Sequence, residues 1–354
     1  MITIGVDAHK TVHAAIAVDE AGQEIGQWRG PNSVSGWHRL LAWAGEQGAS
    51  RQWGIEGAWS YGRGLAQHLV DMGEMVYEVN ARWTAMGRRA ARRTGKTDRL
   101  DARAVALFVR QEAPDLPVVF AEDESAVLDL LTGEREAALS EGVRLRNQIH
   151  ALLMHIDPEY KDHLPSLDSQ AGMRALENYS APRPGILHEE RAASVRRLAK
   201  RLRLAMDQAA DLGRQIASRT EEAGFSPLTN LYGVNLLTAG TLAGILGPGQ
   251  RFNSDARLAA HAGVAPLEAS SAGVVRHRLN RGGNRRLNGV LHRIAITQLR
   301  GWQPAQDYIA RRISEGKSKR EAIRALKRYL VRAVWHLWRQ CAAGQLHIRP
   351  STAA

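Results

Sequence analysis

A change of sequence pattern near residue 120 constrains the fold more than any other feature. Before it, short apolar runs alternate with segments of helical spacing: ITIGVDAHK, HAAIAVDEAGQEIGQWRG with a turn at residues 20–22, SVSGWHRLLAWAGEQG, QWGIEGAW, GRGLAQHLVDMG and EMVYEVN. Runs of four to eight apolar residues are typical of strands, and spacing of three and four is typical of amphipathic helices. A strand, a hairpin and then alternating helices and strands predict an α/β domain.

Beyond this point the strand signals stop and two heptad runs begin. Apolar or small residues recur at spacings of three and four from Leu128 to Ile156, and the run ends before Pro158. A second run extends from Val195 to Ile216. Proline ends a helix and heptads favour helix pairing, so the pattern predicts two long helices separated by a proline-containing stretch. They form either an antiparallel coiled hairpin or a dimerisation arm, and the spacing does not decide between these packings.

The last third of the chain combines short helical segments with Gly and Asn breaks. It ends in a basic amphipathic helix with an apolar stripe at Ile323, Leu326, Leu330, Val334 and Trp338. A length of 354 residues suits two or three domains. We therefore expect an α/β domain over residues 1–120, a helical coiled-coil segment over 121–222 and an all-α domain over 223–354.

The positive charge of the chain is concentrated in two places. Of a formal net charge of +12, residues 272–354 carry +15 and residues 82–110 carry +7, so the remainder is acidic. Solvated helix faces are the alternative, but they mix signs, and RRAARR and NRRLN do not. We expect two nucleic-acid contacts. The residues assigned to them are Arg88, Arg89, Arg92, Arg93, Lys96, Arg276, Arg278, Arg281, Arg285 and Arg286.

Other features narrow the class of protein. No window approaches the 18 apolar residues of a membrane span, and the first residues resemble a strand rather than a signal peptide. A single cysteine, Cys341, excludes a disulfide framework and a cysteine-based zinc cluster. We therefore expect a cytoplasmic, DNA-associated protein of a bacterium, without a membrane partner.

Four carboxylates have the placement of a metal site. Asp7 ends the first strand, Glu56 lies between two glycines in GIEGAW, and Asp98 and Asp101 are three apart on a predicted helix, so they share a face. Four converging acids would repel one another without cations, and Mg²⁺ or Mn²⁺ prefers such all-oxygen ligands. The neighbouring His9 is expected to contact phosphate or to pack, not to bind metal.

The alternative is that each acid is structural. Asp98 would then cap its helix, Glu56 would pair with an arginine and Asp7 would be a turn residue. In nucleic-acid enzymes such a site holds two divalent ions for phosphoryl transfer, and the order of the four acids beside a basic island favours that interpretation.

These motifs resemble the DEDD tetrad of the insertion-sequence-110 family of bacterial transposases. The matching residues are Asp7 in GVDAHK, Glu56 in IEGAWSYG, and Asp98 with Asp101 in GKTDRLDARAVA. The resemblance implies an N-terminal α/β domain of RNase H/RuvC-like fold, a long coiled helical segment and an all-α C-terminal domain. The segment from LYGVN onward is similar to the family's second domain, with a helix-hairpin-helix-like start. Asn235 replaces the usual glycine there, and since Asn tolerates positive φ, we expect the turn to form.

The resemblance also implies a serine nucleophile in the C-terminal domain. Ser271, five residues after Pro266, is the matching position. Ala272 stands where the family usually has glycine, and the adjacent Ser270 leaves the assignment open by one residue. Taken without the resemblance, both serines indicate a polar turn.

The family further implies donor and target DNA, a guiding bridge RNA, a dimer or tetramer, and an active site composed from two domains within or between subunits. Two other functions fit the same residues. One is a RuvC-like nuclease of the Holliday-junction type, which would use metal-activated water. The other is a non-catalytic nucleic-acid-binding scaffold.

Overall fold

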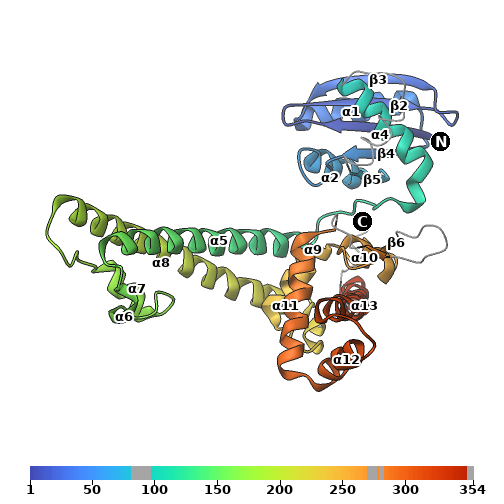
Figure 1. The fold of residues 1–354 in the computed structure, drawn as a ribbon. Helices are drawn as coiled ribbons and strands as arrows, with labels where there is room; N and C mark the ends of the chain where they lie inside the picture. Colours follow the sequence, from blue (N-terminus) through green and yellow to red (C-terminus); the bar gives the residue numbers. More distant parts are fainter. Residues whose placement is uncertain (81–96, 269–276, 279–282, 349–354) are drawn as a thin grey trace. The chain divides into compact units, whose positions relative to one another are not determined.

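The computed structural model describes residues 1–80, 97–268, 277–278 and 283–348. It divides into two compact units, which are described separately (Figure 1). The first comprises Met1–Asp123 with Gln250–Asn253, and the second comprises Glu124–Gly249 with Ser254–Ala354. The predicted boundary near residue 120 lies at the junction of the units, and the one near residue 222 lies inside the second unit.

The first unit is built on one mixed sheet. Its strands are β1 (Ile2–Ala8), β2 (Val12–Val18), β3 (Glu24–Pro31), β4 (Arg51–Glu56) and β5 (Val76–Val79). Their order is β3-β2-β1-β4-β5. The pairs β1–β2 and β2–β3 are antiparallel, and β1–β4 and β4–β5 are parallel. The predicted hairpin is confirmed, with Gly22 at φ +81° in its turn, a conformation that glycine adopts without steric cost.

Helices cover both faces of this sheet. They are α1 (Val34–Gln47), α2 (Arg63–Asp71) and α4 (Asp98–Glu112), followed by the short 3-10 helix η1 (Ala113–Asp115). Ile4, Val6 and Ile55 pack with residues of α1 and α2 in one core. The alternate positions face α4, because a Cβ on Gly5 would lie 2.2 Å from the carbonyl oxygen of Ala102. The backbone of α4 therefore lies directly on β1.

The described residues of the second unit form helices and one two-stranded ribbon. Its elements are α5 (Glu124–Ile156), α6 (Tyr160–His163), α7 (Gln170–Glu177), α8 (Ile186–Glu222), η2 (Ser226–Asn230), α9 (Leu236–Leu246), α10 (Asp255–His261), β6 (Leu267–Glu268), β7 (His277–Arg278), α11 (Arg285–Gly301), α12 (Gln303–Ser314) and α13 (Lys319–Ile348). The coarse expectation, an α/β part followed by helices, is confirmed.

The two heptad runs form α5 and α8, which lie side by side in opposite directions (Figure 1). Arg219 near the end of α8 is 3.7 Å from Glu124 at the start of α5, and Arg201 is 3.1 Å from Glu141. Most of the a and d positions are buried, among them Leu128, Leu145 and Ile149 of α5 and Val195, Leu202 and Ile216 of α8, as in a coiled coil. Of the two packings that the heptads allow, the structure forms the hairpin within one chain.

Helix α9 joins this hairpin to the C-terminal helices. Cβ atoms on Gly240 and Gly244 would lie 2.2 Å from Thr220 Oγ1 in α8 and 2.6 Å from the Asp129 backbone nitrogen in α5. The expected turn before α9 forms, but without a positive φ at Asn235. Asn235 has φ −99° and caps α9 by accepting from Thr238 N at 2.9 Å, while Gly233 takes the positive φ of +87°.

The predicted basic amphipathic helix is confirmed as part of α13. Leu326, Leu330, Val334 and Trp338 are buried, and Trp338 Nε1 donates to Gly247 O at 3.1 Å. Lys319, Arg320, Arg324, Arg332 and Arg339 are exposed, as expected for a helix packed on one side, whereas Lys327 is buried. Among the described residues, no helix has both the length and the apolar composition that crossing a membrane requires.

Candidate metal centre and basic surfaces

Two of the predicted carboxylates lie on adjacent parallel strands. Asp7 of β1 is in register with Glu56, the last residue of β4. Side chains alternate between the faces of a strand, so Asp7 shares the α4 face with Gly5, and Glu56 shares it with Gly54. Asp7 is 7% exposed, which removes most of its hydration. Both acids therefore point toward the face that α4 covers.

The other two carboxylates come from the first turn of α4. The Thr97 hydroxyl caps this helix by accepting from Leu100 N at 3.3 Å, so Asp98 is not the cap. Asp101 is 5% exposed, and Asp98 is partly exposed. Carboxylates in the first turn interact favourably with the helix dipole, which offsets part of the cost of gathering negative charge here.

The structure brings Asp7 and Asp98 together with His9, and the charges of Glu56 and Asp101 act on Asp7. Burial raises the pKa of Asp7, His9 opposes that shift, and Asp101, Glu56 and Asp98 raise the pKa further. Each acid is therefore close enough to Asp7 to act on its charge. One ligand atom each of Asp7, His9 and Asp98 lies within 4.8 Å of the others. A divalent cation could lie between these atoms.

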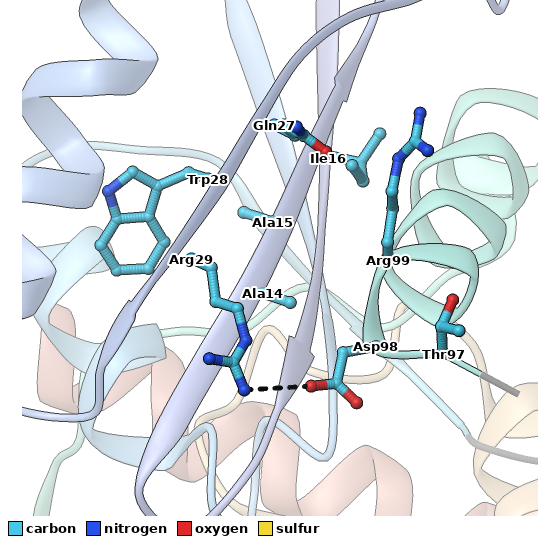
Figure 2. Close-up of a pocket in the computed structure, with 9 residues that line it drawn as sticks. All are labelled: Ala14, Ala15, Ile16, Gln27, Trp28, Arg29, Thr97, Asp98 and Arg99. Carbon is cyan, nitrogen blue, oxygen red and sulfur yellow. Dashed lines mark ion pairs between the residues drawn. The ribbon is translucent and has the colours of Figure 1, made fainter.

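Two nitrogen-bearing side chains, which the sequence patterns did not assign to the cluster, border it. His9 Nε2 is 3.1 Å from Asp7 Oδ2 and 3.6 Å from Asp98 Oδ1. Arg29 of β3 extends its guanidinium to 3.7 Å from Asp98 Oδ2, and Figure 2 shows the two side chains facing one another. The adjacent pocket has a volume of about 640 Å³. Alternate residues of β3 are exposed. This pattern is consistent with an outward-facing Arg29, but it does not indicate that Asp98 is its partner.

The described part of the first basic island is engaged with the β2–β3 hairpin. Arg99 lies 2.8 Å from Glu24, Arg103 lies 3.9 Å from the same side chain, and Arg110 donates to Glu20 O at 3.1 Å. The predicted contacts Arg88, Arg89, Arg92, Arg93 and Lys96 lie outside the described residues.

The second basic region is described in part. Ser270, Ser271, Arg276 and Arg281 lie outside the described residues, and Arg278 is placed by its backbone in β7, paired with Leu267. At the start of α11, Arg285 is exposed. Arg286 instead donates to Asp129 and to Glu136 of α5, each at 2.8 Å. Two adjacent arginines thus have different surroundings.

Carboxylates gathered on the central strands of a mixed sheet, within a strongly basic chain, are typical of enzymes that act on nucleic acids. Comparison with known proteins gives the family. Residues 4–158 match the DEDD family profile described as "Transposase", and residues 226–310 match "Transposase IS116/IS110/IS902 family". The chain belongs to the IS110 family of transposases, enzymes that cleave and recombine DNA.

Two curated relatives agree with this family. The chain is 26% identical over 380 residues to an uncharacterized 44.8 kDa protein of insertion element IS116 from Streptomyces clavuligerus, across 96% of this chain and 94% of the relative. It is 28% identical over 286 residues to an uncharacterized 43.6 kDa protein of insertion element IS110 from Streptomyces coelicolor, across 69% of this chain and 71% of the relative.

Proposed function

We propose that this transposase cleaves and exchanges DNA strands with Mg²⁺ or Mn²⁺ held by Asp7, Glu56, Asp98 and Asp101. The observation that carries the proposal is the convergence on Asp7. Its buried carboxylate is within the electrostatic reach of three other acids that come from a different strand and from a helix. His9 and Arg29 lie beside two of these acids, and a divalent cation would neutralise more of the negative charge gathered here.

The residues present fit a hard divalent cation. Four carboxylates offer the oxygen ligands that Mg²⁺ and Mn²⁺ favour, and His9 adds a nitrogen that Mn²⁺ accepts more readily than Mg²⁺. A bound cation would polarise the scissile phosphate and ease deprotonation of the attacking hydroxyl. The carboxylates would hold the cation, and through it the substrate phosphate, near the ends of β1 and β4. Arg29 lies beside Asp98 in a position to hold a backbone phosphate.

The strand order supports an RNase H/RuvC-like assignment of the first unit. A three-stranded antiparallel portion continues into two parallel strands, and the first strand lies at the centre with an acid at its end. We further propose the three-domain division at residues 120 and 222, because each boundary coincides with a change of sequence pattern.

We assign the nucleophile to Ser271 on the basis of the family resemblance. Its hydroxyl oxygen would bond to phosphorus while one P–O bond of the DNA backbone breaks, and its proton would pass to a base or to solvent. The covalent link keeps the phosphodiester energy for rejoining. Donor and target DNA, a guiding bridge RNA and a dimer or tetramer complete the proposal, and base pairing would supply the sequence specificity.

A covalent-adduct assay tests this function. The protein is incubated with end-labelled DNA that carries the element's own end, with Mg²⁺ or with EDTA, and run on a denaturing gel. We expect a protein–DNA adduct that needs Mg²⁺, is lost in Ser271→Ala and Asp101→Asn, and persists in Ser270→Ala. Mg²⁺-dependent cleavage without any adduct would favour water as the nucleophile. Cleavage unaffected by Asp7→Ala and Asp101→Ala would refute the metal centre.

A further inference from the structure

A basic cavity in the second unit is separate from the carboxylate cluster. It has a volume of about 550 Å³, within the range of about 300–1,000 Å³ that small-ligand sites occupy. Helices α12 and α13, the turn between them, and residues 263–266 form its walls. Its lining includes five cations and one carboxylate: Arg312, Lys317, Arg324, Lys327, Arg328 and Glu321.

The one carboxylate of this lining is committed to capping a helix. Glu321 accepts from the Ser318 backbone nitrogen at 2.9 Å and from the Ser318 hydroxyl at 2.7 Å, while the Ser318 hydroxyl accepts from Glu321 N at 3.4 Å. This reciprocal capping box holds the first turn of α13. Three of the cations lie in ion pairs: Arg312 with Glu315, Arg328 with Asp255, and Arg324 with Glu321 at 3.9 Å. Lys317 and Lys327 carry the remaining positive charge of the cavity.

Lys327 gives the most specific indication of an anionic ligand. It is 8% exposed, and its ammonium donates to Asn288 Oδ1 at 2.7 Å. Within the part of the chain that the structure describes, no carboxylate lies within 4.0 Å of it. A buried ammonium has three donors and loses hydration, so an unneutralised one costs free energy unless an anion binds. A phosphate in the cavity would supply that anion.

The aromatic lining adds a second requirement on the ligand. Tyr308 and Tyr329 meet edge to face with ring centroids 5.3 Å apart. Arg311 and Arg312 lie over the Tyr308 ring, whereas Tyr329 is 58% exposed. An exposed ring beside a positive pocket is the arrangement on which unpaired bases stack while cations hold the backbone. A paired base within a duplex could not reach it.

The position of the cavity connects it to the proposed nucleophile. Its wall at Gly263–Pro266 leads along the chain to Ser271, and a Cβ on Gly283 would lie 2.3 Å from Gly263 Cα. The two ends of the segment that carries Ser271 are therefore held together beside the cavity. A strand anchored here would be held at the base of that segment.

We propose that this cavity binds one unpaired nucleotide of a single strand, with its phosphate on Lys327 and Arg324 and its base on Tyr329. The inference rests on the proposed function for the class of ligand. A guide RNA and an unwound DNA strand offer the same chemistry, so the experiment includes both. Binding needs neither Mg²⁺ nor cleavage, so this proposal and the proposed metal centre can fail independently.

Fluorescence anisotropy of the full chain tests it, with labelled rU12, dT12 and a 20-base-pair DNA duplex in EDTA. We expect Tyr329→Ala to weaken single-strand binding about 5- to 100-fold, and Tyr329→Phe to retain it, because stacking needs the ring and not the hydroxyl. Duplex binding should change less than about twofold. A loss with rU12 alone would identify RNA as the strand, a loss with dT12 alone would identify DNA, and a loss with both would identify the shared nucleotide chemistry.

Charge variants test the phosphate contact. Arg324→Gln and Lys327→Met should each reduce the salt dependence of single-strand binding by about one ion, since each removes one phosphate contact. Arg320→Gln and Lys319→Met are matched controls on the exposed start of α13, outside the cavity lining. Circular dichroism checks that the variants fold. If Lys327→Met does not fold, the variants of Tyr329 and Arg324 still test the proposal, because both residues are exposed. Wild-type affinity for both strands in Tyr329→Ala and Arg324→Gln, or an equal loss with the duplex, would overturn the proposal.

Discussion

Asp7 and Glu56 occupy one register position on adjacent parallel strands, 49 residues apart in the chain, with both carboxylates on the face that α4 covers. Like charges at adjacent positions destabilise a sheet unless something between them compensates. We therefore expect the pair to lower the stability of the metal-free protein, and the proposed cation to compensate for the repulsion.

Removing the charge of Asp7 should make the stability of the protein nearly independent of Mg²⁺. In EDTA, we expect Asp7→Asn to be at least as stable as the wild type. The substitution removes a buried negative charge and with it the repulsion from the three neighbouring acids. Mg²⁺ at about 100 times its Kd should add about 2.7 kcal/mol to the free energy of unfolding of the wild type and much less to the variant. Urea unfolding with and without Mg²⁺ measures both effects, and Asp71→Asn on the exposed end of α2 is the control. Equal stabilisation of Asp7→Asn by Mg²⁺ would contradict the site.

His9 should tune which cation binds. Because imidazole nitrogen suits Mn²⁺ better than Mg²⁺, His9→Gln should weaken Mn²⁺ roughly tenfold and Mg²⁺ much less. Isothermal titration calorimetry gives both affinities, and pulsed EPR of bound Mn²⁺ should show nitrogen coupling in the wild type that the variant lacks. The exposed His38→Gln should change neither. Absence of nitrogen coupling in the wild type would place His9 outside the metal's ligands.

A methyl group on β1 should displace α4. In Gly5→Ala the new Cβ would meet backbone atoms Ala102 O and Ala106 N at 2.2 Å, and backbone cannot rotate aside. We expect a loss of about 1–3 kcal/mol of stability, together with weaker metal binding, because α4 carries Asp98 and Asp101. Gly45→Ala, where nothing lies within 4 Å, should stabilise α1 slightly. Unchanged stability in Gly5→Ala, measured by urea unfolding, would refute the close approach of α4 to β1.

The two adjacent arginines of α11 should behave differently. Arg286→Ala removes hydrogen bonds to Asp129 and Glu136 and should lower the free energy of unfolding by about 1–3 kcal/mol. Added salt should reduce this loss only slightly. The exposed Arg285→Ala should change stability by less than about 0.5 kcal/mol and lower the salt slope of DNA binding by about one. Chemical unfolding and anisotropy measure the two effects. If the stability losses were reversed, Arg286 would not be the residue that ties α11 to α5.

Lys327 should make stability depend on pH in the alkaline range. Burial lowers the pKa of its ammonium below the ordinary 10.5, so between the two values the unfolded chain binds more protons. Wild-type stability should therefore rise with pH across that window, by at most about 1.4 kcal/mol per pH unit. Lys327→Met lacks this slope, and any stability advantage it has at neutral pH should shrink toward pH 10.5. Urea unfolding from pH 7 to 10.5, with the exposed Lys319→Met as control, checks it. Parallel pH profiles for Lys327→Met and the wild type would exclude a buried, charged lysine.

Local patterns predicted most of the elements. Strand β1, the hairpin turning at Gly22, the two heptad helices and the buried stripe of α13 follow from periodicities of two, 3.5 and 3.6, which depend on neighbours in the chain. Local periodicity also gave Asp98 and Asp101 a common helix face. It did not predict the position of the positive φ, which lies at Gly233, while Asn235 caps α9.

Only the tertiary structure decided which distant residues meet. Gly5 lets α4 lie on β1, which places Asp101 near Asp7, and Arg29 reaches Asp98 from a strand far away in the chain. The same holds for the two salt bridges of Arg286 and for the buried ammonium of Lys327. A periodic pattern reports how a segment presents its own faces to core and solvent. It contains no information on which other face it will meet, because that depends on sheet register and backbone approach across the whole unit.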